Sequence, residues 1–414
     1  MTVSVSAQPA SVVALDSPAS AIASARRAML ADRYPLDSLT VEWRALAELH
    51  PVIAEWSELA ARALEPNVFY EPTFMLAAVS VLTPDAGAML VWSSGNPRRL
   101  LGFFPAHLHQ RRYGLKLPIL VGLTHAYGPL GVPLVEREAV EPVIAAWLAK
   151  LAAEPALPGL VLLPFLPLHG PFANALEAIA RRTQMPTADF SLHRRALLAP
   201  SGERALYVEH ALGQHQHKEL RRHWRRLSET GAVLLTAAGD PAAVAAAMED
   251  FYALEMRGWK GRAGTAVAEH QDIRRFTRAA VSGLAAEGKV LINRILVDGA
   301  AIAAAIVLRS GRQAWFWKIA YDESFARFSP GVMLSVALTD ELLDEPTIER
   351  TDSCATPDHP MIDHLWRERL LIGNRLIAVR PQAPFRLAKS LERLRSAAIA
   401  GGKRIFKGLR RHVH

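Results

Sequence analysis

The chain has 414 residues, of which half are hydrophobic and about a fifth are charged. This composition is typical of a folded globular protein and excludes a largely disordered one, and the length suits two domains of ordinary size. The net charge of +8 comes from residues 380–414, which hold ten Lys or Arg and one Glu, so the nearly neutral remainder argues against a nucleic-acid partner.

Cysteine content and hydropathy indicate where the protein works. Its one cysteine, Cys354, has no partner for an internal disulfide, as expected in a reducing compartment. The first residues lack the basic and continuous apolar segments of a secretory signal. The longest apolar runs, such as residues 300–308, reach about half the length of a membrane-spanning helix. We therefore expect a cytoplasmic protein.

The first half of the chain predicts one mixed unit, at residues 36–200. Residues 1–35, rich in Ala, Ser and Val, predict a disordered arm before it. Apolar residues at helical spacing alternate with strand-like runs bounded by Gly, Pro or Asn. A strand-like start is expected from residue 41, and an aromatic turn followed by a helix at residues 67–82. Further helices are expected at residues 53–65, 139–154 and 170–182, and strands at residues 88–94, 100–110, 157–166 and 190–200.

The second half repeats this alternation, and we place a second unit at residues 201–380. Asp298-Gly299 marks a hairpin turn within it. The fold class predicted for the chain is α+β, with two similar units that each have a mixed, mainly antiparallel sheet flanked by helices. Helices are expected at residues 217–230, 241–258, 272–288 and 330–343, and strands at residues 232–238, 289–299, 300–311, 312–322 and 348–353.

The turn Ser329-Pro330-Gly331 separates the last meander strand from the helix that follows it. Pro is well tolerated in a first helical turn, and Gly lets a ligand approach the backbone closely. The unpaired N–H groups at a helix start favour phosphate, and Arg327 adds a cation two residues earlier. The turn is therefore suited to the pyrophosphate of coenzyme A.

These segments resemble the CelD/BcsL-type members of the GNAT acyltransferase superfamily. The resemblance rests on Trp259-Lys260, then "VLINRILVDGAAIAAAIVL", "WFWKIAYDESFARFSPGVML" and "RTDS", in that order. It covers about residues 214–377. Fem peptidoglycan transferases, which are similar in fold, carry tandem GNAT units, so the resemblance implies a duplicated GNAT architecture.

The resemblance also implies a donor site. In the GNAT fold the pantetheine of acyl-CoA lies along the fourth strand, here residues 314–320, and the pyrophosphate meets the start of the next helix. The chain lacks the usual Q/R-x-x-G-x-G loop and has a longer loop with one Pro-Gly. The expected donor is acetyl-CoA or another acyl-CoA, although Fem enzymes use aminoacyl-tRNA. The residues assigned to the donor are Trp317, Arg327, Ser329, Pro330, Gly331 and Val332.

Direct acyl transfer needs a base for the proton of the attacking amine or hydroxyl. Asp352 is the first candidate, because it ends a strand beside the donor strand, and a loop-capping role is its alternative. Lys318 and Asp322 are the second candidates, and the alternative for these two residues is a surface ion pair. Trp259 in turn is open to a plain packing role. The residues assigned to the acceptor are Trp259, Lys260, Tyr321 and His359.

Three further features leave alternatives open. His359 and its acidic neighbours do not have the spacing of a dedicated metal site, and no metal is expected. Cys354 offers an acyl-enzyme route, with a histidine of the same loop as base, and the favoured alternative is a thiol with no part in the reaction. The basic helix at residues 217–230 suits a solvated face, an anionic ligand or RNA.

The C-terminal tail, residues 381–414, mixes leucines with basic residues. This composition predicts either contact with an anionic membrane surface or a solvated, disordered tail. The sequence as a whole predicts an acyl-CoA-dependent N- or O-acyltransferase with an active C-terminal unit, at work in the cytoplasm or at the inner membrane surface. The expected acceptor is a sugar, a polysaccharide precursor, a lipid or a small amine. The alternatives are a Fem-like transferase and a non-catalytic GNAT module.

Overall fold

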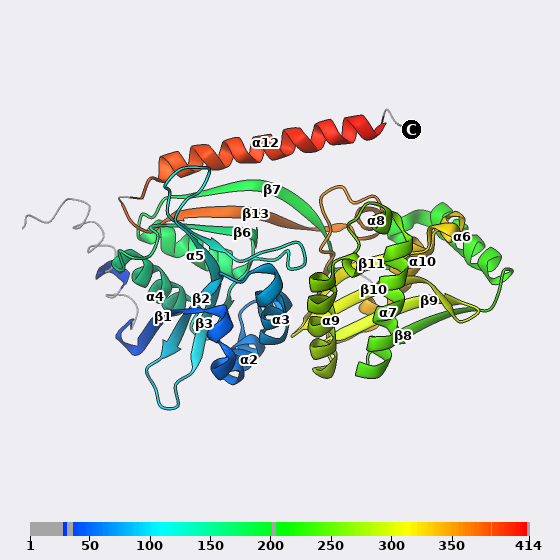
Figure 1. Ribbon diagram of the computed structural model, residues 1–414, viewed down its shortest axis with the longest axis horizontal. Coiled ribbons are helices and arrows are strands. Elements are labelled where there is room, and N and C mark those ends of the chain that lie inside the picture. Colours follow the sequence, from blue (N-terminus) through cyan, green and yellow to red (C-terminus); the bar gives the residue numbers. More distant parts are fainter. Residues whose placement is uncertain (1–27, 31–35, 201–203, 382, 412–414) are drawn as a thin grey trace, which may run out of the picture.

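The computed structural model describes residues 28–30, 36–200, 204–381 and 383–411, so the predicted arm lies outside the described part except at residues 28–30. In that part thirteen strands form one sheet in the order β1-β2-β3-β4-β6-β13-β7-β12-β11-β10-β9-β8, with β5 paired to β3. Figure 1 shows two lobes along this sheet. We call residues 36–200 the N-terminal unit and residues 204–381 the C-terminal unit.

The N-terminal unit packs its helices against strands β1 to β7. Its core is rich in fully buried aromatic side chains, among them Trp56, Phe103 and Trp147, which bury large apolar areas. The expected elements are present, β1 covers the strand-like start expected from residue 41, and β4 and β5 are additional. Their bounds are β1 Leu39–Ala45, α2 Ile53–Arg62, α3 Pro72–Leu82, β2 Gly87–Ser93, β3 Leu100–His109, β4 Ile119–Gly122, β5 Leu134–Val135, α4 Val140–Ala153, β6 Leu160–Pro167, α5 Pro171–Arg182 and β7 Thr187–Leu198.

The C-terminal unit is an antiparallel meander with helices on both faces. Asp298 and Gly299 both have positive φ, 49° and 81°, as the predicted hairpin turn requires. The bounds are α6 Tyr207–Ser228, β8 Val233–Ala238, α7 Pro241–Arg257, α8 Trp259–Arg262, α9 Gln271–Ala286, β9 Val290–Val297, β10 Ala300–Ser310, β11 Gln313–Tyr321, η7 Glu323–Phe328, α10 Pro330–Asp344, β12 Arg350–Asp352, α11 Ile362–Leu365 and β13 Glu368–Ala378.

The last strand, β13, leaves its own unit. It pairs antiparallel with β6 on one side and with β7 on the other, so it lies inside the sheet of the N-terminal unit (Figure 1). Strand β7 in turn pairs with β12. The boundary proposed at residue 200 therefore divides the chain but not the sheet, which runs continuously through both units.

Helix α12 (Phe385–Arg411) covers the outer face of the sheet in the N-terminal unit. Its Ala388 is fully buried in a cluster with Leu160, Phe190 and Leu376. The tail that the sequence predicts as basic and amphipathic is thus a helix over residues 385–411, and its first part is packed. None of the helices within the described residues is both long and apolar enough to cross a bilayer.

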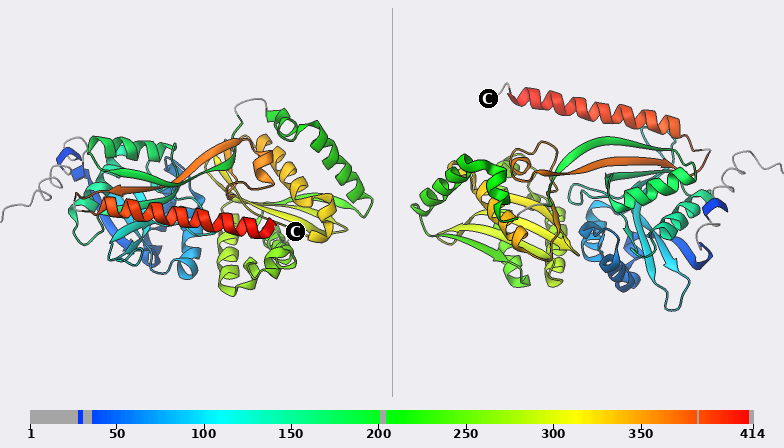
Figure 2. Two further views of the ribbon diagram at one scale, coloured as in Figure 1. Left: turned by 90° about the horizontal axis from the view of Figure 1, so that it is seen from above. Right: turned by 180° about the vertical axis from the view of Figure 1, so that it is seen from behind.

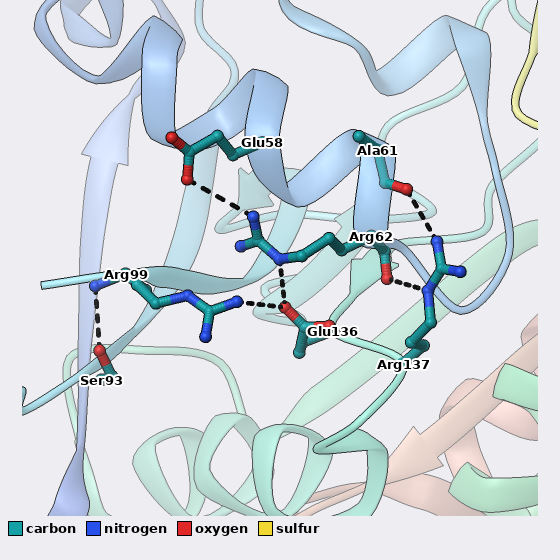
Figure 3. Close-up of polar contacts among 7 residues, drawn as sticks. All are labelled: Glu58, Ala61, Arg62, Ser93, Arg99, Glu136 and Arg137. Carbon is teal, nitrogen blue, oxygen red and sulfur yellow. Dashed lines mark hydrogen bonds and ion pairs between the residues drawn. The ribbon is translucent and has the colours of Figure 1, made fainter.

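A buried carboxylate fixes the connection that follows β5. Glu136 accepts a hydrogen bond from Arg62 Nε at 2.8 Å and pairs with Arg99 at 3.5 Å. Arg137 donates to the backbone oxygens of Ala61 and Arg62 at 2.7 and 2.9 Å, as Figure 3 shows. Because Glu136 is almost fully buried, the end of α2 and the connection after β5 are held together firmly.

Candidate active site

Strands β11 and β12 pair briefly and then part. Their parallel register joins residues 313–315 to residues 350–352 and ends there. Two residues further along β11, the pairing with β10 shifts by one residue at Trp317. Such a bulge bends a strand and strengthens its twist. The bulge therefore coincides with the point where β11 turns away from β12, and the edge of β11 that faces β12 is free of that ladder from there on.

The loop after β11 leads directly into α10. Ser329 stands before the helix in the left-handed conformation, with φ 55° and ψ 50°, and no side chain caps the helix start. A Cβ atom on Gly331 would lie 3.1 Å from Tyr321 Cδ1, so glycine lets the first turn of α10 approach this ring. Arg327 is exposed and Val332 follows in the first turn. The predicted donor residues 329–332 thus lie together at an uncapped helix start.

Lys318 lies on the face of the sheet that meets the N-terminal unit. Its Nζ lies 4.5 Å from the ring centroid of Tyr127 and 5.5 Å from that of Trp317. Lys260 lies nearby and pairs with the buried Glu255 at 2.5 Å. Burial, and then the Lys260 ammonium, lower the pKa of Lys318 to about 8, while Glu255 opposes this shift. A large fraction of Lys318 is therefore neutral at mildly alkaline pH, as a general base requires.

Tyr127 belongs to the N-terminal unit, in the connection between β4 and β5. Its backbone oxygen accepts a hydrogen bond from Trp317 Nε1 at 2.8 Å. The same connection is held by Asn67, whose Nδ2 donates to the backbone oxygens of Leu130 and Val132 at 3.2 and 2.9 Å. The N-terminal unit therefore supplies a fixed aromatic surface beneath Lys318.

Asp352 is held in a buried ion pair. Its Oδ2 lies 3.0 Å from Arg195 Nη1, and the two side chains are 7% and 2% exposed. Arg195 Nη1 also donates to the backbone oxygen of Pro129 at 3.1 Å. The other carboxylate oxygen, Oδ1, accepts from the backbone N of Cys354 at 2.9 Å. Asp352 thus fixes the end of β12 and the turn after it.

The short helix α8 and the 3-10 helix η7 are held together at the surface. Glu323 accepts a hydrogen bond from the backbone N of Trp259 at 2.7 Å and pairs with Arg262 at 2.6 Å. Asp322 caps η7 and lies 3.6 Å from Arg257. The Trp259 side chain is 53% exposed. Trp259 and Asp322 therefore lie at the outer edge of the candidate site, and Lys318 and Lys260 lie further inside it.

The loop after β12 contains the remaining predicted residue, His359. Its backbone N donates to Asp363 at 2.9 Å, and burial lowers the pKa of its ring. Burial, followed by the Asp352 carboxylate, raises the pKa of the Cys354 thiol, which leaves it protonated and a weak nucleophile. Among the described residues, no three His, Cys, Asp or Glu side chains are placed to hold a metal ion.

Two residues of this site were not predicted from the sequence. Tyr127 comes from the other unit, and nothing in its local sequence connects it with Lys318. Glu255 is a charged residue on the buried face of α7, and a buried acid in an apolar stripe is a usable signal because it requires a partner. Trp317 was assigned to the donor, and the structure directs its indole N–H to Tyr127.

Comparison with known proteins finds a family model that is similar to part of the C-terminal unit. Residues 214–358 match the family model described as an acetyltransferase (GNAT) domain. No curated protein matches the chain. The C-terminal unit therefore contains a GNAT acetyltransferase-type domain, and the part of it that matches includes β11, α10 and β12.

Solved structures share the fold of nearly the whole chain. The crystal structure of FemX aligns with 84% of this chain and 99% of its own, at 9% identity and a TM-score of 0.53. The C-terminal DUF2156 domain of a protein assigned as a lysylphosphatidylglycerol synthetase in Agrobacterium fabrum aligns with 82% of this chain and 93% of its own, at 12% identity and a TM-score of 0.51. The predicted α+β fold with tandem GNAT-like units is confirmed.

Proposed function

We propose that the protein is an acyl-CoA-dependent acyltransferase whose C-terminal unit transfers an acyl group, most simply acetyl, directly to an amine or hydroxyl. One observation carries this proposal, namely the parting of β11 from β12 just before the uncapped start of α10. An extended thioester arm fits along a strand edge that has lost its neighbour. A phosphate group fits the helix start to which that strand leads.

The residues around the parting point take separate roles in this proposal. The residues at positions 329–332 and Arg327 bind the phosphates, and bound acyl-CoA supplies a thioester carbonyl open to attack. Lys318 takes the proton from the attacking group on the opposite face of the sheet. The Arg195–Asp352 pair keeps the end of β12 in place, which orients the acceptor without Asp352 itself leaving its ion pair. Asp322 stays a candidate at the outer edge of the site.

The acceptor is proposed to enter beside α8. Trp259 is exposed there and offers a flat apolar surface on which a sugar ring or a lipid can stack. Lys260, Tyr321 and His359 are the further candidates for acceptor contacts. The CelD/BcsL resemblance supports a sugar or polysaccharide precursor and a cytoplasmic location, whereas a small amine requires fewer contacts.

Removal of the phosphate site is expected to abolish donor binding. Wild-type protein should bind acetyl-CoA in calorimetry, and Arg327→Ala should weaken binding by about tenfold or more, since a charge-assisted hydrogen bond contributes roughly 1.5–3 kcal/mol. Gly331→Trp should abolish it, because the new side chain has no room beside Tyr321. Arg312→Ala is the matched control, since Arg312 is exposed at the opposite end of β11. If the wild type does not bind acetyl-CoA, coenzyme A is not the donor.

Tyr127 is expected to matter through its ring. Tyr127→Phe keeps the ring beneath Lys318 and should leave kcat/KM within about twofold. Tyr127→Leu should lower it by roughly thirtyfold, since the ring stabilises the ammonium that forms as Lys318 takes up the proton, and a desolvated cation–π contact is worth about 2 kcal/mol. Steady-state kinetics with acetyl-CoA and a panel of amine acceptors would measure this. Equal activity of the Phe and Leu variants would show that the ring has no part in the reaction.

An aminoacyl-tRNA donor is the second candidate, and α6 is the observation that favours it. Arg221, Arg222, Arg225 and Arg226 are all exposed on this helix, which gives a polyanion a continuous basic surface. Aminoacyl-tRNA binding without acetyl-CoA binding would select this function. Acetyl-CoA binding without release of free coenzyme A to any acceptor tested would favour a non-catalytic GNAT module.

A further inference from the structure

Helix α12 is attached to the body through one face of its first half. Phe385, Ala388 and Leu391 pack on the outer face of the sheet. Glu392 is fully buried and lies 2.6 Å from Arg112 Nη2. Together these contacts fix the direction of the helix, because an apolar contact and a buried ion pair act on adjacent turns.

Ser396 also contacts the body, since its hydroxyl lies 3.1 Å from that of Ser191. Beyond it the helix continues for about four more turns to Arg411. Figure 2 shows this second half extending past the sheet of the N-terminal unit towards the C-terminal unit.

The face of α12 opposite the body carries exposed leucines. Leu387 is 45% exposed and Leu394 is 68% exposed. With Ala398, which is also exposed, they follow one another at intervals of seven and four residues, which places them on one stripe of a helix. This stripe points away from Ala388 and Glu392, so the fold itself leaves it uncovered.

Charge selects the kind of surface that covers this stripe. From residue 385 to residue 411 the sequence has nine Lys or Arg and one acidic residue, Glu392. That one acid is buried against Arg112, so every exposed charge of the described side chains on α12 is positive. Arg386, Arg393 and Arg395 are exposed on both sides of the leucine stripe. An apolar stripe flanked by cations is complementary to an anionic lipid surface.

We propose that α12 binds the surface of an anionic membrane, with Leu387 and Leu394 inserted below the headgroups and the neighbouring arginines at the phosphates. A single apolar or basic signal gives only weak attachment, and α12 combines the two. Because the packed half already holds the helix in place, binding does not have to order it. The attachment is peripheral and independent of which donor the C-terminal unit uses.

The turn that contacts α12 also carries exposed basic and apolar side chains. The turn that supplies Arg112 to the ion pair also presents Arg111, Leu115 and Lys116 to solvent, and Leu115 is 44% exposed. This turn lies against α12 through Glu392. Two segments about 280 residues apart in the sequence are therefore in contact, and both carry exposed basic and apolar side chains.

Cosedimentation of the full chain with vesicles tests the proposal. The wild type should sediment with vesicles of phosphatidylcholine and phosphatidylglycerol, much less with pure phosphatidylcholine, and less as salt is raised. The double variant Leu387→Ser/Leu394→Ser should bind at least about tenfold more weakly, because each buried leucine contributes substantially. Arg386→Gln and Arg393→Gln should each weaken binding by about fivefold.

The matched control is Leu234→Ser/Leu235→Ser, which changes two leucines of similar exposure, 57% and 42%, on strand β8. It should bind vesicles like the wild type, and thermal melts should show all variants folded. The proposal is overturned if the wild type stays in the supernatant with anionic vesicles, or if the Leu387/Leu394 variant binds as tightly as the control. It is also overturned if light scattering shows that these leucines hold a dimer, since a second copy would then cover the stripe.

Discussion

Replacement of Lys318 by methionine is expected to lower kcat/KM by roughly 10²–10⁴, the contribution of a positioned general base. The side chain keeps its length and apolar stem but loses the amine that lies over the Tyr127 ring. Steady-state kinetics with saturating donor would measure the loss. Lys150→Met, at a surface lysine of α4 paired with Glu154, is the control and should leave the rate unchanged.

The pH dependence of kcat/KM should identify Lys318 more directly. Only the neutral amine accepts a proton, so the rate should rise with pH and level off above about 8, the pKa of Lys318 in the folded protein. The Lys260 ammonium helps to lower this pKa, so Lys260→Met should move the rising limb to higher pH. If the pH dependence of kcat/KM is the same in Lys260→Met as in the wild type, the group that titrates is not Lys318.

Replacement of Lys318 by methionine should raise stability although it lowers activity. The pKa of Lys318 is lower in the folded chain than the ordinary value of 10.5, so below pH 8 the folded state holds a charge that burial disfavours. That penalty shrinks as pH rises from 8 towards 10.5. At pH 7, Lys318→Met should therefore raise the free energy of unfolding by about 1–3 kcal/mol. A loss of stability would show that the ammonium is well paired in the fold.

The ion pair between Arg195 and Asp352 should dominate the stability of the junction. Arg195→Met leaves a buried carboxylate without its partner and should lower the free energy of unfolding by about 3–5 kcal/mol, with a similar effect for Asp352→Asn. The double variant Arg195→Met/Asp352→Leu removes both charges and should recover part of the loss. Urea denaturation of the four proteins gives the coupling energy as a double-mutant cycle.

The pair Arg312 and Glu349 supplies the matched control for this cycle. Both side chains are largely exposed, 65% and 60%, and an exposed pair of this kind is worth at most about 1 kcal/mol. Single changes of Arg195 or Asp352 that cost no more than this control would mean that the buried pair does not hold β12 against the N-terminal unit.

Local sequence was sufficient wherever a segment is specified by its own pattern. The meander β9 to β11, its Asp298-Gly299 turn and the start of α10 at Pro330 were predicted because period-two alternation, a turn that requires positive φ and a proline in the first turn are all short-range signals. The residues of the helix start, from Ser329 to Val332, are together for the same reason, since they are neighbours in the chain.

The rest of the site depends on pairing between distant segments. The sequence around Trp317 does not predict a bulge, because a bulge depends on two strands and their register. Strand β13 was not predicted, and its place between β6 and β7 cannot be derived from either half alone. Lys318 was predicted as a residue of interest, but its lowered pKa depends on Lys260 and on burial by the other unit. Long-range burial sets such values, and sequence spacing does not report it.

The position of β13 bears on how the chain is made. Residues 368–378 are synthesised after nearly all of the C-terminal unit, yet β6 and β7 are separated by this strand and have no direct pairing with each other. During translation β6 and β7 therefore lack their shared neighbour, β13, until the ribosome has produced nearly the entire C-terminal unit. The sheet of the N-terminal unit cannot be completed before then. Neither half is then a self-sufficient folding unit. A nascent chain that stops before residue 368 exposes unpaired strand edges, which makes it a substrate for chaperones and prone to aggregation.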